Sequence, residues 1–234
     1  MKPIEEPAAA TPEIAIIDYY AGNMFSVQQA CRHAGMSPVL TSDKKAIAAA
    51  DAVILPGVGA FGEAMNNLRR LDLVSPIADF IQSGRPFIGI CLGLQLLFTK
   101  SEEFGTHRGL GIIDGYVTKF SPKDCSERKI NVPQMGWNQI FLCDNDGGDG
   151  RKFQLLHGIP EGAYMYFVHS FYAVPSSQDI CVTTTDYEGI RYCSAVRQGN
   201  VFATQFHPEK SACEGVKIYH NLARLIISQR RGQA

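Results

Sequence analysis

A short apolar segment that ends in a cysteine and passes at once into a helical pattern constrains this fold more than any other feature. Residues 86–90 predict a buried strand, and Leu92–Phe98 predict the helix that follows it. Cys91 therefore lies at a helix N-terminus, where the positive end of the helix dipole lowers the pKa of a thiol. Gly89 and Gly93 flank it at the spacing of a nucleophile elbow. The alternative is a structural cysteine buried in an apolar segment.

A histidine and a glutamate follow another apolar strand far downstream. His207 and Glu209 come directly after Val201–Phe206, and residues two apart in extended backbone point to the same side. Pro208 between them restricts the backbone, which holds the pair in place. An imidazole can take the proton of a thiol while a carboxylate orients the ring. A lone His-Pro-Glu is more often a surface turn, but together with Cys91 it predicts a nucleophile, a base and an orienting group.

The order of predicted elements favours an α/β fold. The first half of the chain alternates strands and helices, as a parallel sheet requires. From Val117 onward the pattern changes to short strand-like runs, which predict mixed or antiparallel additions. The predicted elements are strands at Ile14–Asp18 and Val53–Leu55, helices at Asn23–Ala34, Ala60–Leu68 and Pro76–Ser83, and later strands at Asn138–Leu142, Tyr164–Val168, Ile180–Thr185, Cys193–Arg197 and Val201–Gln205. Ser211–Glu214 predicts a capping box that opens a final helix.

Three segments that follow predicted strands should meet at one edge of the sheet. Open α/β sheets bind ligands at the carboxyl ends of their strands, and Gly57–Gly59, Cys91 and His207 all occupy such positions. The glycines around Val58 can be read as a tight strand-to-helix turn. They can also be read as part of an oxyanion hole, because glycine lets a backbone N–H turn toward the negative oxygen of a tetrahedral intermediate.

Composition sets the outer limits of the interpretation. The 234 residues suffice for one well-buried domain, which we expect over residues 13–234 after a loose leader at residues 1–12. A net charge of −1 offers no electrostatic footprint for nucleic acid or for an anionic membrane. The seven cysteines are scattered without a C-x-x-C pair, which argues against a disulfide framework and a zinc site. We therefore expect a cytoplasmic protein.

The nucleophile and its partners resemble the triad of class I glutamine amidotransferases, whose thiol attacks the side-chain amide of glutamine and releases ammonia. Further segments resemble the glutaminase subunits of imidazole glycerol phosphate synthase. These segments are Ile17–Asn23, Leu55–Gly62, Met135–Asn138, Tyr166–Tyr172 and Gln205–Ser211. The resemblance runs from about Ile14 to the C-terminal helix. It implies a three-layer, flavodoxin-like domain with a mostly parallel sheet, which hydrolyses L-glutamine to glutamate and ammonia through a Cys91 thioester.

The resemblance also implies roles for other positions. The N–H groups of Val58 and Leu92 would form the oxyanion hole. Substrate would be bound by Gly57 and Gln95, by Glu103 through the α-ammonium group, and by the backbone of Ser170 and Phe171. Simpler interpretations are a solvent-facing Gln, a surface Glu in a charged loop, and the end of a strand. No metal or organic cofactor is implied, because thiol, imidazole and backbone donors suffice for amide hydrolysis.

A separate subunit is implied as the acceptor of the ammonia. In the family, a cyclase subunit with a (β/α)₈ barrel uses the ammonia to make imidazole glycerol phosphate and an aminoimidazole carboxamide ribotide during histidine biosynthesis. The chain shows no cyclase barrel, phosphate loop or nucleotide motif of its own. The resemblance places Asn23, Trp137, Tyr166 and Lys210 at the interface of the heterodimer, and it implies that the partner and its ligand activate the glutaminase.

The sequence departs from the family pattern at two places, and alternatives remain. Tyr20-Ala21 replaces a more usual Gly-Met or Gly-Ile, and Gln134 stands where the family often has His. Both departures fall in segments associated with the subunit interface. The alternatives are a glutaminase of another biosynthetic pathway, a peptidase of the same fold, or a catalytically silent subunit that only stabilises its partner.

Overall fold

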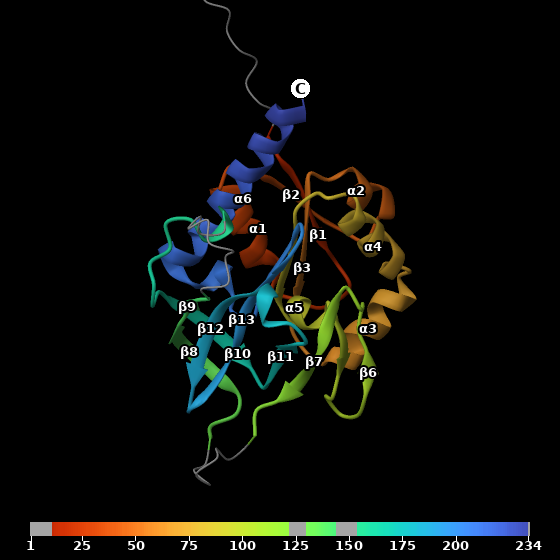
Figure 1. Ribbon diagram of the computed structural model, residues 1–234. Helices are drawn as coiled ribbons and strands as arrows, with labels where there is room; N and C mark the ends of the chain where they lie inside the picture. Colours follow the sequence, from red (N-terminus) through yellow and green to blue (C-terminus); the bar gives the residue numbers. More distant parts are fainter. Residues whose placement is uncertain (1–10, 122–129, 144–153, 234) are drawn as a thin grey trace, which may run out of the picture.

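A twisted sheet of eight strands forms the centre of the molecule (Figure 1). The computed structural model describes residues 11–121, 130–143 and 154–233. In spatial order the strands are β2 (Ser37–Thr41), β1 (Glu13–Ile17), β3 (Ala52–Gly57), β4 (Phe87–Cys91), β14 (Val201–Thr204), β13 (Ile190–Gln198), β12 (Cys181–Tyr187) and β9 (Phe141–Leu142). The first five run parallel to their neighbours, and the last three are added antiparallel. The predicted mixed α/β sheet is confirmed.

Helices cover both faces of this sheet and give the fold three layers. One face carries α1 (Met24–His33) and α6 (Ala212–Gln233), and Figure 1 shows the other beneath α2 (Lys44–Ala49), α3 (Phe61–Arg70) and α4 (Val74–Gln82). Alternate residues of β1 supply the two separate cores. Ile14 and Ile16 pack with α1 and α6, whereas Ala15 and Ile17 pack with the helices opposite.

Two smaller sheets lie beside the central one. One pairs β8 (Gln134–Gln139) with β10 (Tyr164–His169), and the other has the order β11-β7-β5-β6. Its strands are β11 (Phe171–Pro175), β7 (Ile113–Lys119), β5 (Phe98–Ser101) and β6 (His107–Arg108). The remaining elements are α5 (Leu92–Leu96) and three 3₁₀ turns, η1 (Gln154–Leu156), η2 (Gln178–Ile180) and η3 (Pro208–Lys210). The sequence pattern predicted antiparallel additions in the second half of the chain. Some of these later strands extend the central sheet, and others form the two smaller sheets.

The helix that follows the nucleophile strand is shorter than its sequence pattern predicts. It ends at Leu96, and Phe98 already begins strand β5. The cause is a hydrogen bond from outside the helix, because the N–H of Leu110 donates to the Leu96 carbonyl at 2.8 Å. The N–H of Ile112 donates to the Leu97 carbonyl in the same way, at 2.9 Å. With these carbonyls occupied, the chain leaves the helix.

The predicted capping box at Ser211 is not formed. The Ser211 hydroxyl accepts the Tyr166 N–H at 2.9 Å and donates to the His207 carbonyl at 2.6 Å. The carboxylate of Glu214 pairs with Lys217 instead of reaching back. Ser211 therefore joins β10 to the turn that carries His207, and the first turn of α6 has no such cap.

One expectation falls largely on residues that lie outside the described part of the chain, because ten of the twelve residues of the expected leader belong there. The single domain over residues 13–234 stays a prediction. Among the helices of the described residues, none combines the length and the apolar character that a membrane crossing requires.

Candidate active site

Cys91 occupies a strained turn between β4 and α5. Its backbone φ is +54°, in the left-handed region that side chains other than glycine rarely adopt. Such a conformation persists only where the surrounding structure enforces it, and it is common at functional sites. The residue is 6% exposed. The structure thus shows the sharp connection that the spacing of Gly89 and Gly93 predicts.

Close packing of α5 against the sheet explains the glycine at position 93. A Cβ atom there would lie 1.8 Å from the Leu55 carbonyl oxygen, so no other residue fits. Leu55 belongs to β3, whose last residue, Gly57, pairs with Cys91 across the parallel ladder. The turn that carries the Cys91 sulfur is therefore fixed against the strand that leads to Val58.

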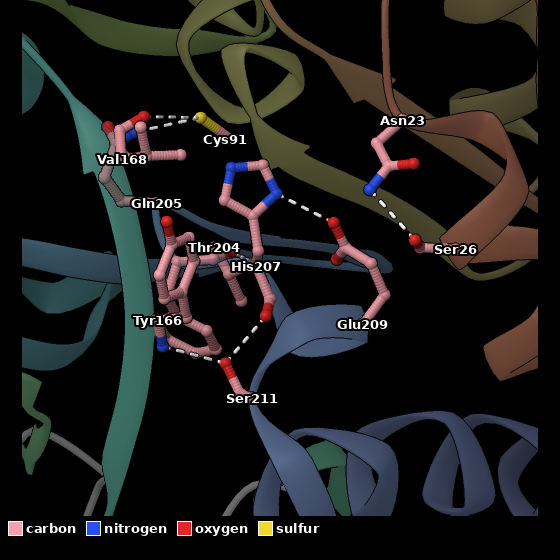
Figure 2. Close-up of polar contacts among 11 residues, drawn as sticks. Asn23, Ser26, Cys91, Tyr166, Val168, Thr204, Gln205, His207, Glu209 and Ser211 are labelled. Atoms are coloured by element: carbon pink, nitrogen blue, oxygen red, sulfur yellow. Dashed lines mark hydrogen bonds and ion pairs between the residues drawn. The ribbon is translucent and has the colours of Figure 1, made fainter. Parts of the chain in front are cut away.

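His207 and Glu209 follow β14, the next strand beside β4. Their side chains are 2% and 1% exposed, and His207 Nδ1 lies 2.8 Å from Glu209 Oε1. The backbone N–H of His207 donates to the Tyr166 carbonyl at 2.9 Å, which fastens this turn to β10. Figure 2 shows the imidazole between the carboxylate of Glu209 and the sulfur of Cys91. The three residues that the sequence pattern groups are brought together.

The charges around the imidazole favour its protonated form. Burial alone lowers the pKa of His207, but the negative Cys91 sulfur and the Glu209 carboxylate outweigh burial and raise that pKa to about 10. Nε2 of His207 is buried without a hydrogen-bond partner and lies on the side of Cys91 in Figure 2. The Cys91 sulfur and the Glu209 carboxylate are therefore the two groups that hold the His207 imidazole in its charged form.

Gln205 is a member of this site that sequence reasoning missed. It is fully buried, and its Nε2 donates to the Cys91 sulfur at 3.7 Å. The Cys91 sulfur also lies 3.9 Å from the Val168 carbonyl oxygen. The alternation that places His207 and Glu209 on one side also places Gln205 there, so a signal was present.

A cavity of about 430 Å³ opens in front of Cys91. It is lined by residues from the ends of several strands and from the loop after β5, and half of the fourteen predicted site residues are among them. The lining residues are Val58, Gly59, Cys91, Leu92, Gln95, Glu103, Phe104, Lys119, Pro133, Val168, His169, Ser170 and Phe171. A cavity of this size at the carboxyl ends of parallel strands suits a small polar substrate.

The side chain of Gln95 is held by two acceptors. Its Nε2 donates to the Phe171 carbonyl at 2.9 Å and to Gln205 Oε1 at 3.1 Å. Both amide hydrogens are used, and Gln95 is only 5% exposed. The buried, fixed amide excludes the solvent-facing interpretation of Gln95.

Glu103 lines the cavity and also caps a helix. Its Oε2 accepts the N–H of Phe61 at 2.5 Å, at the start of α3, where Ala60 provides no side-chain cap. A carboxylate is favoured there by the helix dipole. This contact was not foreseen, because Glu103 and Phe61 lie far apart in the sequence. The carboxylate faces both the cavity and the segment that follows Val58.

The two glycines beside Val58 have different structural reasons. A Cβ on Gly57 would meet the Tyr19 hydroxyl at 2.3 Å, so packing requires glycine there. That hydroxyl donates to the Pro56 carbonyl at 2.7 Å and fixes the end of β3. Gly59 instead has a φ of +99° with open space around it. Val58 lies between a fixed and a permissive glycine, and its side chain is 44% exposed.

Three of the four predicted interface residues, Trp137, Tyr166 and Lys210, lie at the sheet formed by β8 and β10. Trp137 is 50% exposed, its ring meets that of Tyr166 edge-on at 6.1 Å, and the Lys210 ammonium lies 5.8 Å from the Tyr166 ring centre. Met135 and Tyr164 add exposed apolar surface to the same sheet. Asn23 lies apart, at the start of α1, where its amide donates to Ser26 at 2.9 Å. In the described residues, no group of three or more His, Cys, Asp or Glu side chains could hold a metal ion.

Comparisons with known proteins identify similar sequences. The model of the family described as glutamine amidotransferase class-I matches residues 15–223. The imidazole glycerol phosphate synthase subunit HisH of Rhodopirellula baltica is 47% identical over 210 residues, which cover 90% of this chain and 96% of that protein. The HisH subunit of Syntrophotalea carbinolica is 48% identical, over 89% of this chain and 98% of that protein.

Solved structures show a similar fold at low identity. A putative GMP synthase subunit from Thermoplasma acidophilum has a TM-score of 0.67 at 17% identity, covering 97% of this chain and 99% of that chain. PurLQS from Thermotoga maritima has a TM-score of 0.70 at 19% identity, covering 92% and 99%. At these identities the likeness concerns the fold alone.

Proposed function

Since the chain belongs to the class I glutamine amidotransferases, and within them to the family of HisH subunits of imidazole glycerol phosphate synthase, we propose that Cys91 is its glutaminase nucleophile. The observation that carries this proposal is the buried Cys91, His207 and Glu209 array at the end of the cavity. In this role the chain converts L-glutamine to glutamate and ammonia.

The chemistry divides into two steps that share one thioester. The Cys91 sulfur attacks the side-chain carbonyl carbon of glutamine, and the carbonyl oxygen takes the negative charge. The His207 imidazolium gives its proton to the amide nitrogen, the carbon–nitrogen bond breaks, and ammonia leaves. Neutral His207 then takes a proton from water, whose oxygen attacks the thioester and releases glutamate and the thiolate. Glu209 orients the ring and stabilises its charged form.

The cavity supplies donors for the oxyanion and contacts for the substrate. Leu92 begins α5, so its N–H has no partner within the helix, and we assign it to the oxyanion hole together with the N–H of Val58. Gln95 and Glu103 hold the α-amino acid end of glutamine, with the Glu103 carboxylate facing the α-ammonium group. Backbone groups of Ser170 and Phe171, with Gly57 behind the site, complete the binding surface.

The ammonia requires an acceptor, and we assign that role to a cyclase subunit bound as a heterodimer through β8 and β10. The exposed Trp137, the Tyr166 ring and Lys210 support this face as the interface. The complex then acts in histidine biosynthesis. The six described cysteines are all free thiols, which supports a reducing cytoplasm.

Glutamate release tests the proposed function. The full chain is supplied with glutamine alone, with the cyclase subunit of the same organism, and with that subunit plus its nucleotide ligand. We expect slow release by the chain alone and strong activation in the complete mixture, both abolished in Cys91→Ser. Absence of glutamate release from the wild-type chain in all three mixtures would reject the proposal.

A further inference from the structure

A line of buried polar side chains runs from β8 to the wall of the cavity. The side-chain amide of Asn138 lies 2.9 Å from that of Gln134, which lies 2.8 Å from the Tyr192 hydroxyl. Tyr192 lies 3.2 Å from His169 Nε2, and His169 Nδ1 lies 2.8 Å from the Phe171 carbonyl. Gln134, Tyr192 and His169 are 0%, 4% and 6% exposed. No role in the chemistry accounts for these three residues.

The line continues from the Phe171 carbonyl to the nucleophile. That carbonyl accepts from Gln95 Nε2 as well as facing His169, so two fixed groups converge on one oxygen. Gln95 donates in turn to Gln205, whose amide donates to the Cys91 sulfur. A displacement of the Phe171 carbonyl would therefore release the substrate-facing Gln95 before it reached Cys91.

The hydrogens along the line can be placed by counting donors. Burial lowers the pKa of His169 to about 3, so the ring is neutral and carries one hydrogen. The Phe171 carbonyl only accepts, which puts that hydrogen on Nδ1 and leaves Nε2 as an acceptor. The single Tyr192 hydrogen then goes to Nε2, and the Tyr192 oxygen needs a donor from Gln134.

This count decides the orientation of two amides. With Oε1 of Gln134 facing Tyr192, two acceptors would compete for one hydroxyl hydrogen. The ends of a side-chain amide have the same shape, and rotation by 180° removes the conflict. Gln134 Nε2 then donates to Tyr192, and Asn138 Nδ2 donates to Gln134 Oε1. Each contact in the line then pairs one donor with one acceptor, and the hydrogens in these contacts all point from β8 toward the cavity.

We propose that Gln134, Tyr192 and His169 are positioning residues for glutamine, because their one-directional hydrogen-bond chain holds the Phe171 carbonyl and thereby aims the Gln95 amide at the substrate. The inference rests on the proposed glutaminase function. It gives a role to Gln134, one of the two places at which this sequence departs from the family pattern. It also attaches the substrate-binding wall to β8, the strand that carries the exposed Trp137.

The hydroxyl of Tyr192 can be removed without changing the packing of its ring. Tyr192→Phe breaks the chain at its middle, and we expect the KM for glutamine to rise about fivefold to tenfold with a small change in kcat, the size of one lost buried hydrogen bond. Alkylation of Cys91 by iodoacetamide, which does not use Gln95, should keep its wild-type rate. A merely structural change would lower both kcat and the alkylation rate.

Tyr187→Phe is the matched control. Tyr187 lies in the same β12–β13 hairpin as Tyr192 and packs on the same Phe120 ring. Its hydroxyl donates to the Asn131 carbonyl at 2.8 Å, which is not part of the hydrogen-bond line from Gln134 to Phe171. Its KM should stay at the wild-type value. Gln134→Leu should reproduce the effect of Tyr192→Phe. The KM of the double variant should be no higher than that of either single variant, because both changes break the same hydrogen-bond line.

The experiment separates this inference from the proposed function. All variants are assayed as full chains in complex with the cyclase subunit. An unchanged KM in Tyr192→Phe, or equal effects of Tyr192→Phe and Tyr187→Phe, would overturn the positioning role while the wild-type activity stands. Additive effects of Tyr192→Phe and Gln134→Leu on KM would show that the two residues contribute separately. That result would contradict a single hydrogen-bond line.

Discussion

At the scale of single residues, His207 and Glu209 should contribute unequally to catalysis. His207→Ala removes the group that moves the proton, and hydrolysis should fall to the background level. Glu209→Gln keeps a hydrogen-bond acceptor for Nδ1 but removes a negative charge that holds the pKa of His207 high. We expect activity between that of the wild type and His207→Ala, measured as kcat with saturating glutamine. Equal losses in both variants would contradict these roles.

His169 should make the folded state sensitive to acid. Its pKa is lowered to about 3 by burial, against 6.5 in an unfolded chain. Below pH 6.5 the unfolded state therefore binds a proton that the folded state refuses, and stability falls as the pH falls. The contribution is fully present above pH 6.5 and is lost at up to about 1.4 kcal/mol per pH unit toward pH 3.

Urea unfolding of the wild type and of His169→Gln at pH 7.5 and pH 5 measures this effect. The variant is less stable at both values, but its loss between them should be smaller by roughly 2 kcal/mol. The exposed His33, replaced in His33→Gln, serves as the control for loss of a histidine from the surface. Identical pH dependence in wild type and His169→Gln would show that His169 titrates normally.

At the scale of elements, the contact between α5 and β3 determines the position of the nucleophile. Gly93→Ala places a methyl group where the Leu55 carbonyl lies, so α5 must move away from β3. We expect a loss of stability of about 3 kcal/mol or more and loss of glutaminase activity. Gly232→Ala, at an open position near the end of α6, should be neutral or slightly stabilising. Thermal unfolding compares the two, and a wild-type midpoint in Gly93→Ala would contradict the packing argument.

Local patterns in the sequence predict those features of the structure that depend on residues close together in the sequence. The parallel half of the sheet, the elbow at Cys91 and the common side of His207 and Glu209 follow from periodicity and backbone geometry. The end of α5 does not, because Leu110 supplies the competing N–H from a distant loop. The same holds for Ser211, whose hydroxyl is used by β10 and His207 in place of its own helix.

Part of the site depends on contacts between distant segments, which the sequence could not predict. The cap that Glu103 gives to α3 and the chain from Gln134 through Tyr192 to His169 join residues that no local pattern connects. Gln205 is different, since the alternation that identified His207 extends to it. The resemblance to a known family placed substrate-binding residues on the cavity, but it assigned no role to Tyr19, Gln205 or Tyr192.

At the scale of the whole molecule, the face formed by β8 and β10 should carry the activating signal from a partner. Trp137 is half-exposed and contacts Tyr166, whose backbone carbonyl holds His207. Trp137→Ala should therefore lose most of the activation by the cyclase subunit, while alkylation of Cys91 in the isolated chain stays normal. Activation equal to that of the wild type would exclude Trp137 from the coupling.

Covalent labelling tests the central claim most directly, since every role assigned above depends on Cys91 being the nucleophile. The wild-type chain and Cys91→Ser are treated with a chloroketone analogue of glutamine, and the products are mapped by intact and peptide mass analysis. We predict one adduct per wild-type chain, located at Cys91, protection by glutamine, and no adduct in folded Cys91→Ser. Labelling mainly at other cysteines, or equal labelling of both proteins, would contradict the account.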